Sequence, residues 1–362
     1  PLCEERGHRR RMGGDKRRYR GRGRTTAGPE CRCGKGLHAD GFACAVLRDD
    51  FQRREWNWLP ALDAREGNLE PPKRQPLEWR NPEFYDDAPL FDELHRVYDV
   101  CHGCRRCFNL CNAFPRLFDL IDEGPTGELD GVDKERYWDV VDQCYLCDMC
   151  FMTKCPYVPP HPLNIDFPHL MLRAKAVRFR ESGAPLRERL LTSTDAVGRL
   201  AAIPVVAQVV NATNRMPAAR AVMEKAIGVH RSRELPPYAS RKFRTTAKPD
   251  DGPAVRAGAS APGKAAVFAT CYVNCNEPDL GHDLLAVLAH NEIPTVLVDD
   301  EVCCGMPKLE LGDFESVDRN KARNIPGLAR LAREGYAILT AVPSCTLMFK
   351  QELPLMFPDD LQ

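Results

Sequence analysis

The chain has 362 residues, enough for two or three domains that each bury a core. Hydrophobic residues make up 43% and charged residues 28%, and no apolar run approaches the roughly 20 residues that span a bilayer, which argues against an integral membrane protein. Lysine plus arginine (51) balances aspartate plus glutamate (51), which argues against a chain built throughout to bind nucleic acid, and we expect a cytoplasmic protein.

Residues 1–64 are the basic part of the chain, with 15 Lys and Arg against 9 Asp and Glu. They contain an Arg- and Gly-rich run at 9–24 and no sustained hydrophobic period, so we expect a disordered or spurious extension. An RNA-binding tail is the less favoured alternative, because aromatic residues that could stack on bases are nearly absent. Four of the chain's seventeen cysteines fall here without the paired spacing of a zinc site: Cys3, Cys31, Cys33 and Cys44.

A repeat of helix and cysteines marks residues 65–182. Leu90, Leu94 and Tyr98 recur at helical spacing and lead directly into a cysteine triplet, and the same pattern returns 43 residues later. Each triplet is followed by a fourth cysteine. A reduced cytoplasmic chain has little structural use for so many thiols, so we expect them to bind metal. The eight are Cys101, Cys104, Cys107, Cys111, Cys144, Cys147, Cys150 and Cys155, the last preceding Pro156.

The spacing of these triplets indicates iron-sulfur cubanes. A triplet occupies three corners of such a cluster, and the fourth ligand comes from elsewhere. Zinc is the weaker alternative, because it prefers two separated pairs of ligands. The rule for two-cluster ferredoxins predicts crossed quartets: Cys101, Cys104, Cys107 and Cys155 for cluster 1, and Cys144, Cys147, Cys150 and Cys111 for cluster 2.

Residues 183–235 read as a helical connector and residues 236–263 as a linker rich in Pro, Gly and Lys. The most apolar part of the connector is Ala196–Ala212, which is interrupted by Arg199 and Pro204. We expect a helix packed in the core there, with an interfacial helix or a partner-docking face as the less favoured alternative.

Residues 264–362 alternate between strand and helix. We expect strands at 265–270, 293–298 and 336–342, with helices at 280–291 and at 316–334, the second broken near Pro326. Short turns between them predict a parallel sheet.

The remaining cysteines follow these strands. Cys271 follows the first strand, the Cys303-Cys304-Gly305 run the second, and Cys345 the third. Carboxyl ends of parallel strands meet at one edge, where open α/β sheets bind ligands, so we expect a cofactor site there. Gly305 would allow close backbone approach to a bulky group. Buried free cysteines are the alternative interpretation.

The two triplets, together with Cys271, the Cys303-Cys304-Gly305 run and Pro343-Ser344-Cys345, resemble the iron-sulfur subunits related to heterodisulfide reductase and to the corresponding subunit of anaerobic glycerol-3-phosphate dehydrogenase. The resemblance covers residues 65–362. It implies an α-helical ferredoxin-like domain with two 4Fe-4S clusters, then a small α/β domain of the CCG type. It also implies an electron relay between a flavoprotein or other redox subunit and a quinone or disulfide acceptor, with peripheral contact at the inner face of the membrane.

Two departures from that family bear on the expected site at Cys271, Cys303, Cys304 and Cys345. The family's CCG module usually ends in Cys-x-x-Cys, whereas Met348 stands where the last cysteine would be, and Cys275 is the replacement we consider. Family members also generally carry two such modules. We therefore expect the C-terminus to be truncated, and the CCG site to hold a third cluster only when completed. Whether the chain is itself an enzyme stays open: a disulfide or sulfur reductase acting at the CCG cysteines and a zinc-structured adaptor are the alternatives, and no catalytic residue is assigned.

Overall fold

The computed structural model describes residues 70–250 and 263–360, all of which fall in the second of the chain's two contact units, Pro60–Gln362. Our expectations for residues 1–64 and for the linker segment 251–262 lie outside these described ranges.

The first described part is helical, as expected. Its core forms where α2 packs against α3 and α5, and it buries Leu90, Leu94 and Tyr98 of the periodic stripe together with Met171. Its elements are η1 (Pro82–Tyr85), α2 (Asp87–Cys104), α3 (Ala113–Asp122), η2 (Leu129–Gly131), η3 (Lys134–Arg136), α4 (Tyr137–Val141), the π-helical turn η4 (Cys150–Lys154) and α5 (Phe167–Ser182).

The two copies of the repeat differ in how they present their cysteines. In the first copy α2 runs through Cys101 to Cys104, so two of the three cysteines are helical. In the second copy the helix ends at Val141, Cys144 and Cys147 lie in an irregular turn, and Cys150 is the first residue of η4. A helix therefore leads into each triplet, but only the first helix itself contains cysteines of its triplet.

The connector is a chain of short helices, and its most apolar helix is not a core helix. Only Ala207 of α8 is buried, while Val205 and Val209 are 70% and 60% exposed. The expected core helix is wrong because the chain breaks before Pro204 and turns away from the preceding helix by 103°. The helices are α6 (Leu186–Leu191), α7 (Thr194–Ala201), α8 (Pro204–Arg215), α9 (Pro217–Ile227) and α10 (Phe243–Thr246).

Across the described ranges, no single helix has the length and hydropathy to cross a membrane. The bent pair α7 and α8 reaches that length and hydropathy only when the two are taken together.

The C-terminal part contains the predicted three-stranded parallel sheet, in the order β2-β1-β3. Ala265 pairs with Thr295 on one side and with Ala337 on the other. Because β1 is central, helices cover both of its faces: Val267 packs with Leu285 of α12, whereas Phe268 belongs to the main core. The strands are β1 (Ala265–Phe268), β2 (Thr295–Leu297) and β3 (Ala337–Thr340).

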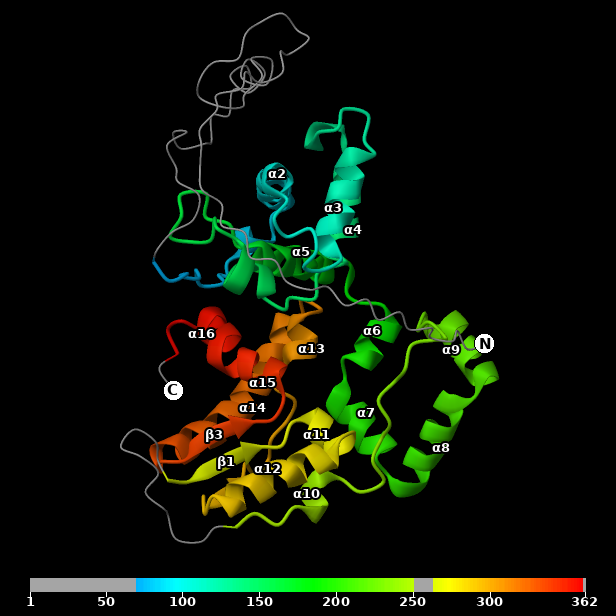
Figure 1. The fold of residues 1–362 in the computed structure, drawn as a ribbon, viewed down its shortest axis with the longest axis vertical. Coiled ribbons are helices and arrows are strands. Elements are labelled where there is room, and N and C mark those ends of the chain that lie inside the picture. Colours follow the sequence, from blue (N-terminus) through cyan, green and yellow to red (C-terminus); the bar gives the residue numbers. More distant parts are fainter. Residues whose placement is uncertain (1–69, 251–262, 361–362) are drawn as a thin grey trace, which may run out of the picture. The chain divides into compact units, whose positions relative to one another are not determined.

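The helices around this sheet follow the expected positions with one exception (Figure 1). Helix α14 continues through Pro326, so the expected break there is wrong. Pro326 and Ala322, whose carbonyl loses its helical partner, are both exposed, so water can solvate the freed oxygen. These helices are α11 (Cys271–Cys275), α12 (Pro278–His290), α13 (Met306–Leu309), α14 (Phe314–Arg333), α15 (Pro343–Leu347), η5 (Met348–Glu352) and α16 (Leu353–Met356).

An extended strap, residues 70–80, joins the helical part to the sheet part. The Lys73 N–H donates to the Pro159 carbonyl at 3.0 Å, and the Leu77 N–H donates to the Leu355 carbonyl at 2.9 Å. The Trp79 indole N–H donates to the Met356 carbonyl at 3.0 Å. One hydrophobic core runs through both parts, so the cysteine triplets and the sheet edge are held in one packed structure.

Candidate metal centres

The first centre is a cavity of about 320 Å³ at the C-terminal end of α2. The structure brings four cysteines together around it: Cys101, Cys104, Cys107 and Cys155. Most of the remaining wall is apolar, and it includes Phe114, Phe118 and Ile165. These four cysteines are the ones that the crossed quartets assign to cluster 1.

The second centre lies beside the first. Cys144 interacts electrostatically with Cys111 and Cys147, and Cys150 interacts with Cys144 and Cys111. Cys150 also interacts electrostatically with the Cys101 and Cys107 thiols of the first centre. Cys144 and Cys150 are buried, whereas Cys147 is exposed.

The environment of four of these thiols opposes their ionisation as free cysteines. Burial raises the pKa of Cys144 and of Cys155 to about 11, and burial raises the pKa of Cys101 and Cys150 further. Several neighbouring thiolates would need cations between them to be stable in this environment. The iron ions of a cluster would supply that positive charge in place of the thiol protons, so the donor set fits a thiolate-bound cluster.

Left-handed backbone marks both cysteine turns. Arg105, between Cys104 and Cys107, has a φ of 51°, and the second turn holds Leu146 at 50° and Asp148 at 61°. Residues other than glycine rarely adopt this backbone conformation, and its steric cost is higher for leucine than for aspartate. Such strain persists where surrounding contacts impose it, and it is concentrated at functional sites.

The third centre lies at the carboxyl edge of the sheet. Cys271 opens α11 immediately after β1, Cys303 and Cys304 follow β2, and Cys345 lies in α15 after β3. Their thiols lie close enough together to shift one another's pKa. The structure therefore brings together the four cysteines that follow the strands.

The thiols of the third centre differ in how readily they ionise. The neighbouring thiols of Cys271 and Cys304 lower the pKa of Cys303, whereas proximity to Cys303 and burial raise the pKa of Cys271 and Cys304. Thr270 is β-branched and has a φ of 59°, and its hydroxyl accepts the Val273 N–H at 3.2 Å. A positive φ at a β-branched residue is a genuine outlier, and this one directly precedes Cys271 of the candidate site.

Comparison with known proteins identifies this part of the chain. Residues 265–350 match the CCG family, described as a cysteine-rich domain. The chain carries a CCG domain. It is also related to a subunit of the anaerobic glycerol-3-phosphate dehydrogenase of Escherichia coli K12, with 25% identity over 194 residues, which are 53% of this chain and 47% of that relative. The resemblance expected from the sequence is thus confirmed.

Two further relatives match shorter stretches. Citrate utilization protein B of Escherichia coli is 27% identical over 93 residues, 26% of this chain and 22% of the relative. A subunit of the fumarate reductase (CoM/CoB) of Methanothermobacter marburgensis is 34% identical over 88 residues, 24% of this chain and 17% of the relative. The chain therefore spans at most about half the length of these relatives. No solved structure matches it significantly.

Met348 stands three residues after Cys345, where the family resemblance implied a second cysteine. It is fully buried, and its Cε lies 3.4 Å from where a Cβ on Gly305 would be. Gly305 itself has a φ of 103°, a conformation that favours glycine. Cys275 is also buried, but its sulfur lies against Gly198 of α7, 2.9 Å from where a Cβ would stand.

Two connector residues belong to the CCG site although sequence reasoning missed them. Asp195 accepts the Cys303 backbone N–H at 2.7 Å. The Thr194 hydroxyl oxygen is buried without a hydrogen-bond partner among the described residues, and it lies near the Cys271 and Cys303 thiols, whose pKa values it lowers. An orphaned buried hydroxyl beside these thiols fits a sulfur-rich group that would accept its hydrogen. No local pattern in the connector marks either residue.

Within residues 70–250 and 263–360, no three His, Cys, Asp or Glu side chains converge as ligands of a single metal ion.

Proposed function

We propose that the chain is an iron-sulfur electron-transfer subunit of an oxidoreductase. The observation that carries the proposal is the cavity where Cys155 joins the first triplet, because it unites four thiols from distant parts of the sequence. The relatives support it, since two of them are named as subunits of a dehydrogenase and of a reductase.

We assign two 4Fe-4S clusters to the crossed quartets: Cys101, Cys104, Cys107 and Cys155 for one, and Cys144, Cys147, Cys150 and Cys111 for the other. Such clusters accept and release single electrons with little movement of atoms. The chain's own contribution is to hold the two quartets side by side in an ordered core. Apolar walls such as Phe114 and Phe118 would keep water from the first cluster.

The third centre is where we place a further cluster or a disulfide-type acceptor. Its ligands would be Cys271, Cys303, Cys304 and Cys345, with the Thr194 hydroxyl as a hydrogen-bond donor. The buried position of Cys303, Cys304 and Cys345 supports a cofactor there over an open catalytic thiol.

The partners follow the same reasoning. A flavoprotein or other redox protein would deliver electrons, and a quinone or a disulfide would receive them. The exposed valines of α8 support a docking role for the connector, because a large apolar helix face is otherwise left open to water. We place the chain in the cytoplasm, with its partner complex at the inner face of the membrane.

Anaerobic purification followed by iron, sulfide and zinc analysis tests the proposal. We expect about eight irons and eight sulfides per chain from the two cubanes, because the CCG site would hold a further cluster only when completed, and a reduced protein with paramagnetic cluster signals. Colourless protein with stoichiometric zinc would overturn it. Turnover of a disulfide by the isolated chain, supplied with reduced viologen, would instead make the CCG domain a reductase.

A further inference from the structure

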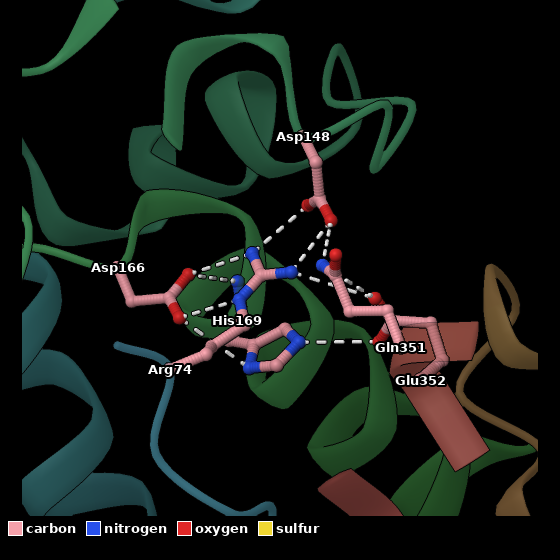
Figure 2. A network of polar contacts seen from close by, with 6 residues as sticks. All are labelled: Arg74, Asp148, Asp166, His169, Gln351 and Glu352. Atoms are coloured by element: carbon pink, nitrogen blue, oxygen red, sulfur yellow. Dashed lines mark hydrogen bonds and ion pairs between the residues drawn. The ribbon is translucent and has the colours of Figure 1, made fainter. Parts of the chain in front are cut away.

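A buried network of charged side chains joins the strap, the turn that carries Asp148, α5 and η5 (Figure 2). At its centre is Arg74 of the strap, whose side chain is 5% exposed. Its guanidinium pairs with both oxygens of Asp148, at 2.5 and 2.9 Å, and with both oxygens of Asp166, at 2.8 and 3.0 Å. It also lies 3.4 Å from Glu352 and 4.4 Å from the centre of the Phe151 ring. Bidentate pairs of this kind fix both partners in orientation.

Two further side chains close the network. Gln351 donates to Asp148 at 2.7 Å, and His169 Nε2 lies 3.1 Å from Glu352. The ring of His169 also lies 3.4 Å from Asp166 through Nδ1. A cavity of about 210 Å³ adjoins these groups and is lined by Asp148, His169 and Glu352 among others.

The network carries an excess of negative charge. Three carboxylates, Asp148, Asp166 and Glu352, face a single guanidinium and one imidazole, so the sum is negative whichever form His169 takes. Their side chains are at most 18% exposed. Buried charges are screened weakly, so they act on neighbouring groups over longer distances than surface charges do.

The position of Asp148 connects this charge to the second centre. Asp148 lies in the turn between Cys147 and Cys150, and its backbone is left-handed with a φ of 61°. The contacts from Arg74 and Gln351 hold its side chain and thereby hold that turn. The same guanidinium contacts Glu352 in η5, the helical turn that follows α15 and its Cys345.

We infer that Arg74 is a positioning residue that fixes the cysteine turn of the second centre and sets the reduction potential of the cluster bound there. This inference rests on the proposed function. Reduction adds one negative charge to that cluster, and the Arg74 cation offsets the neighbouring carboxylates. Without it, their unbalanced charge disfavours the added electron, so the potential becomes more negative.

Charge-changing variants of the full chain test this inference. The variants are Arg74→Gln, Arg74→Lys, Asp148→Asn and the double variant Arg74→Gln with Asp148→Asn. Arg80→Gln is the matched control, because Arg80 lies on the same strap, pairs with Asp318 at 3.3 Å and is 64% exposed. Each protein is purified anaerobically and titrated with dithionite, while electron paramagnetic resonance follows the two clusters. The second-centre signal is identified as the one lost in Cys144→Ala.

We expect Arg74→Gln to shift the second-centre potential to more negative values and Asp148→Asn to shift it the other way. The double variant should return towards the wild type, and Arg74→Lys should stay near it because it keeps the charge. A purely mechanical role would not produce opposite shifts that cancel. Arg80→Gln should leave both potentials unchanged.

The outcomes separate this inference from the proposed function. Wild-type protein without clusters would overturn the proposed function. Clusters present, with the same potential in Arg74→Gln, Asp148→Asn and the wild type, would overturn the role of Arg74 alone. If Arg74→Gln fails to assemble clusters, the comparison of Asp148→Asn with the double variant gives the same answer, because that pair also differs by the Arg74 charge.

Discussion

The carboxylate of Asp195 accepts a hydrogen bond from the backbone N–H of Cys303 at 2.7 Å, although 108 residues separate the two. Asp195 lies in the first turn of α7, in the connector, and Cys303 lies in the CCG domain. The same helix contacts α11, and its Gly198 packs against the Cys275 sulfur. The connector therefore forms one wall of the candidate site.

Removing that acceptor should destabilise the chain. In Asp195→Ala the Cys303 N–H loses its partner, and an unpaired buried donor costs about 1–3 kcal/mol. Asp195→Asn retains an oxygen acceptor and should lose less. Urea unfolding under anaerobic conditions measures the free energy of unfolding. Asp299→Ala, at a side chain that is 83% exposed, is the control and should change it by less than about 0.5 kcal/mol. Equal losses in Asp195→Ala and this control would contradict the assigned hydrogen bond.

Gly312 is a point of close backbone approach between the CCG domain and the helical part. A Cβ on Gly312 would stand 2.6 Å from the Ala176 Cα of α5, and the glycine has a φ of 83°. Gly312→Ala should therefore combine backbone strain of about 1–2 kcal/mol with an overpacking cost of about 1–3 kcal/mol. Thermal unfolding measures the loss of stability.

Gly335→Ala is the matched control for this prediction. Gly335 has a similar φ of 87°, but the nearest atom to its Cβ position is the flexible Lys264 Cε at 3.6 Å. It should show the strain without the clash. If both alanine variants lose the same stability, the close contact at Ala176 is not a constraint.

Local patterns predicted much of this structure, and contacts distant in sequence account for what they missed. The apolar run Ala265–Phe268 sufficed to predict a buried strand, and the cysteine pattern sufficed to predict that Cys271 lies just beyond its end. The exposure of α8 did not follow from its composition, because Val205 and Val209 suit a core and a docking face equally well. Arg74 and Asp195 each act through one side chain on partners that are distant in the sequence. The residues next to them in the sequence give no signal of these contacts.

Met348 should limit what the CCG site can bind. A thioether is a poor ligand for iron, so Met348→Cys, which restores Cys-x-x-Cys with Cys345, should raise the iron content from about eight towards about twelve per chain. Met348 is fully buried against the Gly305 turn, so the new thiol would be buried next to that turn. Met356→Cys adds a buried thiol in α16 and is the control. Equal iron gain in both variants would contradict a specific role for position 348.

The crossed quartets predict that Cys155 belongs to the cluster of the first triplet. The Cys155→Ala variant should therefore lose about four of roughly eight irons. Double variants show which of the two clusters has been lost. Adding Cys101→Ala to it should remove no further iron, because both changes damage the same cluster. Adding Cys144→Ala should remove nearly all of it, because the second cluster is then lost as well.

The reverse arrangement provides the internal control. Cys111→Ala combined with Cys144→Ala should keep about four irons, whereas Cys111→Ala combined with Cys101→Ala should keep almost none. The physical reason is that the first-centre cavity is lined by Cys155 and not by Cys111, whereas Cys111 interacts electrostatically with Cys144. Iron and sulfide analysis of the four double variants gives the assignment without separate spectra for each cluster. If the two pairs of results are exchanged, each triplet takes its fourth ligand from its own repeat, and the crossed assignment is wrong.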